Sequence, residues 1–115
     1  MHELSICQAL LVQVEKIVSE HQARAAAQII VHIGPLAGVE PRLLQQAFPI
    51  AAAGSVAQSA ALHIEELPLR VHCDSCGAES EAQPNRLLCG ACGDWHTRLI
   101  SGDEMVLASV ELIKS

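Results

Sequence analysis

Two runs of sequence, Cys73-Asp-Ser-Cys76-Gly77 and Cys89-Gly-Ala-Cys92-Gly93, decide which folds are open to this chain. In each run two residues separate a pair of cysteines, so one tight turn presents both sulfur atoms to the same ion. The glycine that follows each pair permits a left-handed turn. Twelve residues separate the pairs, which is enough chain to fold back as a hairpin. The two runs therefore predict a pair of zinc knuckles that share one four-thiolate site.

The candidate zinc ligands are Cys73, Cys76, Cys89 and Cys92. Zn²⁺ prefers four tetrahedral ligands in structural sites, and thiolates suit it. Two alternatives use the same residues: a rubredoxin-like iron site, and two redox dithiols. A site closed by four cysteines leaves no coordination position for a substrate, so the pattern predicts a structural metal and no catalysis at this site.

The size and charge of the chain exclude several function classes. Its 115 residues make one ordinary domain, or one domain with a small insert, and half of them are hydrophobic. The net charge of −6 disfavours binding to nucleic acid or to an anionic membrane surface. Between residues 70 and 98, three arginines face four carboxylates, so the cysteine segment is also anionic. No run of apolar residues approaches the roughly 20 needed to span a membrane.

The start Met1-His2-Glu3 is acidic and does not resemble the basic leader of an exported protein. We therefore expect a cytoplasmic protein. In that reducing compartment, paired thiols bind metal more often than they form disulfides.

Hydrophobic periodicity predicts two helices and three strands. The first helix covers residues 4–18, and the second begins at Pro41 and ends at Gly54, with Pro49 expected to kink or split it. The expected strands, which are rich in β-branched or alternating apolar residues, are 28–33, 60–67 and 105–113. In the last strand we expect one shared face, made by Val106, Ala108, Val110 and Leu112.

The order of these elements predicts an α+β fold. The last two strands flank the cysteine segment, so we expect them to pair antiparallel with the segment as an enlarged hairpin tip. The expected architecture is a small three-stranded antiparallel sheet with two helices on one face and an inserted zinc-ribbon lobe. Residues 1–70 and 98–115 would form the α/β domain, and residues 71–97 would form the zinc-binding domain.

The N-terminal residues form a second candidate metal site. His2 is too large for the initiator methionine to be removed, so we expect a free amine at Met1. That amine, the backbone nitrogen of His2 and the His2 imidazole can form adjacent chelate rings, and a tetragonal set of nitrogen donors suits Ni(II) or Cu(II). Glu3 is a further candidate, either as a ligand or as an acid that favours the helix start. Taken alone, a histidine at position 2 is more typical of an exposed and unused side chain.

The other histidines and the fifth cysteine have simpler interpretations. His72 and His96 flank the knuckles and are candidate metal neighbours, although exposed loop histidines are the more common case. Cys7 lies on the apolar stripe of the first helix and is expected in the core. We assign no metal role to His21, His32 and His63.

The N-terminal motif and the knuckles together resemble the HypA/HybF family of nickel metallochaperones. The resemblance covers essentially the whole chain. Besides both knuckles, the matching segments are Met1-His2-Glu3-Leu4-Ser5-Ile6, Gly38-Val39-Glu40-Pro41, Ala47-Phe48, Leu62 to Pro68 and the strand that follows Gly102-Asp103-Glu104.

The resemblance implies a carrier that binds Ni(II) at its N-terminus through His2 and delivers it to the large subunit of [NiFe]-hydrogenase during maturation. It also implies partnership with a HypB-type GTPase and, in some bacteria, supply of urease through a urease accessory protein. We expect a monomer or a weak homodimer. The alternative is a zinc-ribbon interaction module without a nickel role.

Overall fold

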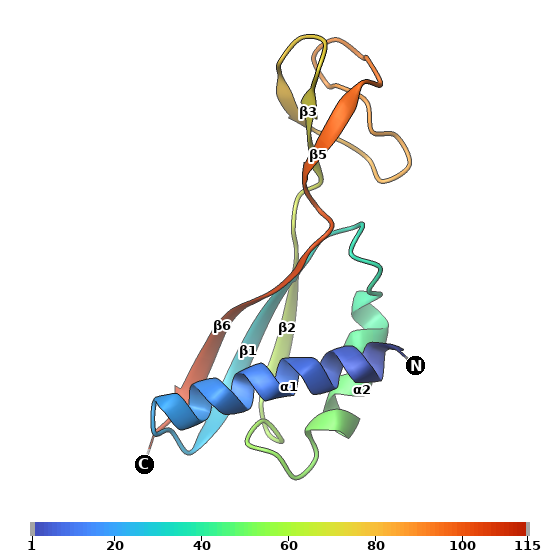
Figure 1. Ribbon diagram of the computed structural model, residues 1–115. Coiled ribbons are helices and arrows are strands. Elements are labelled where there is room, and N and C mark those ends of the chain that lie inside the picture. The colour runs from blue at the N-terminus through green and yellow to red at the C-terminus, as the bar shows by residue number, and fades with distance from the viewer. Residues whose placement is uncertain (1, 115) are drawn as a thin grey trace. The chain divides into compact units, whose positions relative to one another are not determined.

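The computed structural model describes residues 2–114, and for His2 the backbone alone. Contacts divide the chain into two compact units. The first contains Met1–Val31, Val39–Glu65 and Val106–Ser115, and the second contains His32–Gly38 and Glu66–Met105. Figure 1 shows the order of the elements along the chain. No helix within residues 2–114 has the length and apolar character needed to cross a membrane.

Helix α1 (His2–Glu20) forms because its apolar residues recur at helical spacing. Its buried stripe consists of Cys7, Leu10, Leu11, Val14 and Val18. The helix ends where Gln22 adopts a positive φ of 52°, so that the Ala23 N–H reaches back to the Val18 carbonyl at 2.9 Å. Glycine or asparagine usually occupies such a left-handed position, so the sequence carried no clear signal for this end.

Helix α2 (Pro41–Ala52) starts where the sequence predicts. Pro41 occupies the first turn, and the Glu40 side chain accepts a hydrogen bond from the Arg42 N–H at 3.3 Å. The expectation that Pro49 could split the helix is wrong, because α2 continues through it. Phe48 is buried, as is Ala52 one turn later, and this packing holds the last turn in place although Pro49 cannot donate a backbone hydrogen bond.

Three strands form the first sheet: β1 (Ala25–Ile33), β2 (Ala61–Glu66) and β6 (Met105–Ile113), in the order β2-β1-β6. The α+β class with two helices is confirmed. The predicted pairing of β2 with β6 is wrong, because β1 lies between them. The central strand is β1, whose Ile29, Val31 and Ile33 are all buried. The most buried strand of this sheet is therefore the central one, with a partner on each edge.

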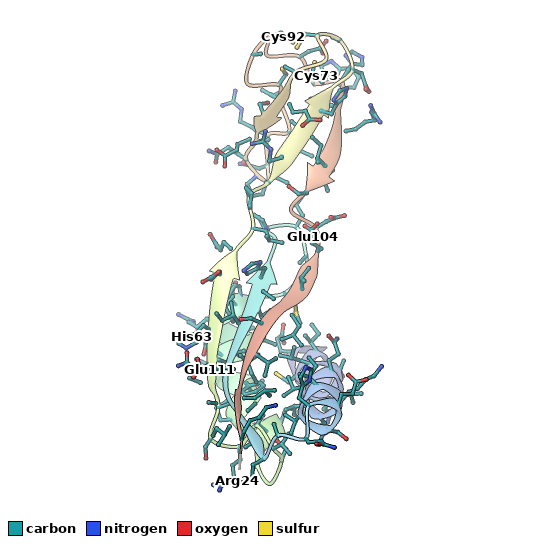
Figure 2. All side chains as sticks on the ribbon, turned by 90° about the vertical axis from the view of Figure 1, so that its left-hand side faces the viewer. Arg24, His63, Cys73, Cys92, Glu104 and Glu111 are labelled. Carbon is teal, nitrogen blue, oxygen red and sulfur yellow. The ribbon has the colours of Figure 1, made fainter. Side chains whose placement is uncertain are left out.

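The first sheet is mixed rather than antiparallel. Arg24 donates to the Ile113 carbonyl and Gly34 to the Glu104 carbonyl, which makes β6 antiparallel to β1. On the other edge a hydrogen bond joins Gln28 to His63, and Leu67 donates to the Ile33 carbonyl, so β2 runs parallel to β1. Figure 2 shows the arrowheads of β1 and β2 pointing the same way, with α2 behind the sheet. Because α2 connects β1 and β2, it makes the crossover that a parallel pair requires.

The burial of β6 differs from the expected pattern. Met105 and Leu107 are half-buried, and so are Val110 and Leu112, but Ala108 and Ser109 are both exposed. The alternation therefore changes phase in the middle of the strand, and Val106 and Ala108 do not share the face of Val110. A strict period of two had predicted a single face for all four positions.

The cysteine segment forms a sheet of its own, with strands β3 (Arg70–Cys73), β4 (Glu79–Glu81) and β5 (Thr97–Ser101) in the order β4-β3-β5. Both pairings are antiparallel, with Val71 opposite Ser80 on one side and Leu99 on the other. Val71 and Leu69 are the apolar centre of this part. Sequence reasoning missed these strands, because each is only three to five residues long and turn residues surround them.

Candidate metal centre

The four predicted cysteines come together. Their sulfur atoms all lie within 4.8 Å of one another, and this is the metal-binding group found among the described residues. The Cys73 and Cys92 sulfurs are 3.6 Å apart, as are those of Cys76 and Cys89. Tetrahedral zinc with bonds of about 2.3 Å sets neighbouring sulfurs about 3.8 Å apart. The spacing therefore fits one zinc ion at the centre of the group.

Two turns of the same form position the sulfurs. Gly77 donates to the Cys73 carbonyl and Gly93 to the Cys89 carbonyl, each at 2.9 Å. Both glycines have a positive φ, 76° and 79°, which confirms the left-handed turn predicted from the sequence. The first knuckle connects β3 to β4, and the second lies between β4 and β5. The lobe thus folds so that its two turns face one ion.

Backbone N–H groups point at the sulfurs within each knuckle. The Cys73 sulfur accepts from the Cys76 N–H at 3.4 Å. The Cys89 sulfur accepts from Ala91 at 3.3 Å and from Cys92 at 3.4 Å. Such donors stabilise negative charge on sulfur and orient the ligand. Cys73 and Cys89 are also buried, whereas Cys76 and Cys92 are exposed.

The electrostatics of the group call for a cation. Hydrogen bonds from the Cys92 and Ala91 N–H groups lower the pKa of Cys89 to about 6. At Cys92 the Asp94 N–H lowers the pKa, but the nearby thiols, Cys73 first, and burial together raise it to about 12. Four sulfurs this close cannot all be thiolates unless a positive ion offsets their repulsion. A divalent metal supplies that charge, so the charge of the four sulfurs and their spacing both fit a zinc ion.

Polar residues around the second knuckle hold it without joining the group. The Asp94 carboxylate accepts from the Ser75 hydroxyl and from the His96 N–H at 3.1 Å, and its other contact is the His96 ring nitrogen Nδ1 at 2.7 Å. The Ser75 and His96 hydrogen bonds hold the pKa of this carboxyl well below its usual range. His96 therefore binds Asp94 beside the second knuckle, and it is not part of the four-cysteine group.

His72 also lies outside the four-cysteine group, and its Nδ1 is 3.7 Å from Glu79. Arg98, which is opposite His72 on β5, donates to Asp74 at 2.8 Å.

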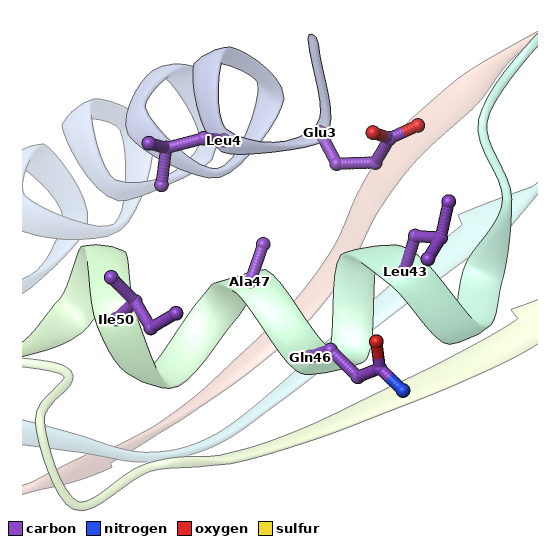
Figure 3. A pocket seen from close by; sticks show the side chains of 6 residues that line it. All are labelled: Glu3, Leu4, Leu43, Gln46, Ala47 and Ile50. Atoms are coloured by element: carbon purple, nitrogen blue, oxygen red, sulfur yellow. The ribbon is translucent and has the colours of Figure 1, made fainter. Parts of the chain in front are cut away.

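The first unit contains the rest of the expected metal residues. Met1 and the His2 side chain lie outside the described residues. Glu3 is in the first turn of α1, half-buried, and lines a pocket of about 270 Å³ between α1 and α2 (Figure 3). Cys7 is buried, and burial together with the nearby Glu3 raises the pKa of its thiol. Its sulfur is 3.8 Å from the Leu44 carbonyl, which confirms its expected place in the core.

Comparisons with known proteins match the chain from end to end. A family model described as "Hydrogenase/urease nickel incorporation, metallochaperone, hypA" matches residues 1–112. The hydrogenase maturation factor HypA of Nitrosospira multiformis is 49% identical over 113 residues, 98% of each chain. The HypA of Aquifex aeolicus is 44% identical over 112 residues, 97% of each chain.

Solved structures agree on the fold. The solution structure of the Ni metallochaperone HypA from Helicobacter pylori has a TM-score of 0.72 at 23% identity and covers 98% of each chain. A second solution structure, of a HypA protein, has a TM-score of 0.76 at 25% identity and covers 100% of this chain and 98% of that one. The family model and the relatives match nearly the whole chain, and the four-cysteine site fits zinc. The chain belongs to the HypA family of metallochaperones for hydrogenase maturation.

Proposed function

We propose that this protein carries Ni(II) at its N-terminus, on Met1, His2 and Glu3, and hands it to the large subunit of [NiFe]-hydrogenase. The observation that carries the proposal is the match of the nickel-incorporation family from residue 1 onward. Nickel is the cargo of this protein, whereas zinc stays bound. We assign the zinc to Cys73, Cys76, Cys89 and Cys92, on the spacing of their sulfurs.

The start of α1 supports this assignment. The helix begins at His2, and the first four N–H groups of a helix have no partner within it. The backbone nitrogen of His2 is therefore not committed to the hydrogen bonds that hold α1 together. Nickel can take up an amine, a backbone nitrogen and an imidazole here without unwinding a turn. Nitrogen donors in a tetragonal set suit Ni(II).

The proposal divides the work between two parts of the chain. Residues 1–70 and 98–115 form the nickel-binding domain, and residues 71–97 form the zinc-binding domain. The zinc is structural because four cysteines close its coordination. No step of carriage or transfer needs a catalytic group, so the protein acts by binding and release and is not an enzyme.

The partners follow from the role. The family places the chain in the hydrogenase maturation machinery. Within it we propose a HypB-type GTPase and the hydrogenase large subunit as direct partners, and a urease accessory protein where urease is also supplied. We propose the cytoplasm as the site of action, because the four thiols need a reducing compartment to stay available for metal.

A comparison of four proteins tests the nickel site. They are the unmodified protein, a form with one or two residues added before Met1, His2→Ala, and His21→Ala as a matched control that removes an exposed imidazole from the other end of α1. The extension turns the Met1 amine into an amide, and His2→Ala removes the imidazole. Both should abolish specific nickel binding and hydrogenase maturation, while His21→Ala should change neither.

Zinc content and melting temperature should stay nearly constant across the four proteins, because neither the extension nor His2→Ala removes a cysteine or one of the apolar residues of the described core. The nickel site is refuted if the extended protein and His2→Ala both keep nickel at full affinity. Loss of nickel only together with zinc would also count against it, since the two metals would then share one site.

A further inference from the structure

Trp95 is an unusual surface residue for this chain. The protein has one Trp, one Phe and no Tyr, and Phe48 is buried in the core. Trp95 instead has 71% of its surface exposed, on the loop between the second knuckle and β5. Tryptophan is enriched among the residues that dominate protein interfaces, so an exposed tryptophan is a candidate contact residue.

The ring of Trp95 is held in place by its neighbours. It stacks on the His96 ring, with 3.8 Å between centroids and 28° between planes. His96 is fixed by Asp94 through Nδ1 at 2.7 Å, and the Asp94 carbonyl accepts from the Cys89 N–H at 2.9 Å. The Trp95 carbonyl accepts from Thr97 at 2.8 Å. One face of the indole is thus covered by an imidazole, and the surface presented to a partner is pre-organised.

The unit that contains this ring carries a net negative charge. The second unit contains three arginines and seven carboxylates, a net charge of −4. Arg98, the nearest arginine in sequence, is paired with Asp74 at 2.8 Å. An aromatic face in a negative field attracts cations, because the ring quadrupole and the field act in the same direction. It repels phosphate, so a nucleic acid does not fit.

We propose that Trp95, with His96 stacked on its ring and Asp94 bound to His96, is a docking surface for a basic protein segment, whose arginine or lysine side chain lies over the free face of the indole. Nickel binding at the N-terminus and the four-cysteine site use none of these side chains as ligands. The surface would give the carrier a contact with its partner that is separate from the cargo. The proposal therefore stands or falls separately from the assignment of the nickel ligands.

Tryptophan fluorescence tests this directly, because all indole emission of the protein comes from Trp95. The probes are an oligoarginine peptide and an oligoglutamate peptide of the same length. We expect oligoarginine to change the emission of the zinc-loaded protein saturably, and the effect to weaken as salt is added. Oligoglutamate should leave it unchanged. If oligoarginine gives no saturable change, or oligoglutamate gives an equal one, the proposal is wrong.

Variants separate the indole from general charge attraction. With a labelled oligoarginine peptide and anisotropy as readout, Trp95→Leu should bind about two- to fivefold more weakly than wild type, and Trp95→Phe should lie between them, as expected for a cation over an exposed ring. Val12→Ala, which trims an exposed apolar residue of α1, is the control and should bind like wild type. Equal affinity of the Leu and Phe variants and wild type overturns the proposal.

Zinc and nickel stoichiometry, measured on the same samples, should not change. Loss of zinc in both the Leu and the Phe variant would assign Trp95 a structural role instead of a docking role.

Discussion

Gly34→Ala should destabilise the protein strongly, because Gly34 lies against the backbone of Gly102. A Cβ at position 34 would be 2.2 Å from both the carbonyl carbon and the carbonyl oxygen of Gly102. Two hydrogen bonds depend on this close approach: Gly34 donates to the Glu104 carbonyl at 2.8 Å, and Leu36 donates to the Gly102 carbonyl at 2.7 Å. The clash is with main chain, so no change of side-chain rotamer relieves it.

The size of the effect follows from these distances. Ordinary contacts of a Cβ begin at 3.4 Å, so the two segments must separate by more than an ångström. Overpacking of this kind costs about 1–3 kcal/mol, and each lost hydrogen bond adds about 1 kcal/mol. The expected loss is therefore about 3–5 kcal/mol. At about 4 °C per kcal/mol, the melting temperature should fall by roughly 10–20 °C.

Thermal unfolding of zinc-loaded protein, followed by circular dichroism, measures this loss, and Gly38→Ala is the matched control. Gly38 has φ +76° and no atom within 4 Å of an added Cβ, so alanine there costs only the left-handed strain of about 1 kcal/mol. The reasoning is refuted if Gly34→Ala melts within a few degrees of wild type, or no lower than Gly38→Ala.

Three further changes have clear expected outcomes. Gln22→Gly should raise the free energy of unfolding by about 1 kcal/mol, measured by urea denaturation, because Gln22 has a positive φ of 52° that glycine adopts without strain; an unchanged midpoint would contradict this. Cys73→Ser should lose zinc and unfold mainly β3–β5, detected by metal analysis and amide hydrogen exchange, whereas Cys7→Ser should keep zinc because Cys7 lies outside the four-cysteine group. Nickel occupancy should fall steeply from about pH 7.5 to about pH 5.5, since an α-amine (pKa about 7.7–8.0) and an imidazole (pKa about 6.5) bind only when deprotonated; equilibrium dialysis that shows constant occupancy would point to carboxylate or thiolate ligands.

Local signals carried most of what could be predicted from the sequence. The helical spacing of apolar residues predicts α1, Pro41 predicts the start of α2, and β-branched residues predict β1. The knuckles are the strongest case, because two cysteines and a glycine at fixed spacing determine a turn by themselves. Each of these features depends on residues within a few positions of one another, so one sequence is enough to show it.

Features that depend on tertiary contacts could not be predicted. Nothing local says that β1 lies between β2 and β6, since this order comes from burying Ile29, Val31 and Ile33 on one face. The same applies to the Pro49 turn of α2, which packing retains. The strands of the lobe are too short for a period to show, and Val71 is paired on both sides only because the knuckles bring β4 and β5 to it. Apolar residues beside a predicted metal site are the signal that could have revealed them.

The two metal sites differ in how firmly the fold holds their ligands, and this difference suits one metal for structure and the other for transfer. Around the four sulfurs, backbone N–H groups and two left-handed glycine turns hold both ligand pairs, so a zinc ion there has four ligands placed by the fold. Of the proposed nickel ligands, His2 and Glu3 instead belong to the first turn of α1, where the helix dipole is positive and disfavours a cation by about 0.3–1 kcal/mol. Glu3 offsets part of this repulsion from the same turn. Because the helix dipole opposes the cation, this site holds nickel less tightly than the same donors would elsewhere. Weaker binding suits a carrier, which must release its nickel to a partner that offers better ligands.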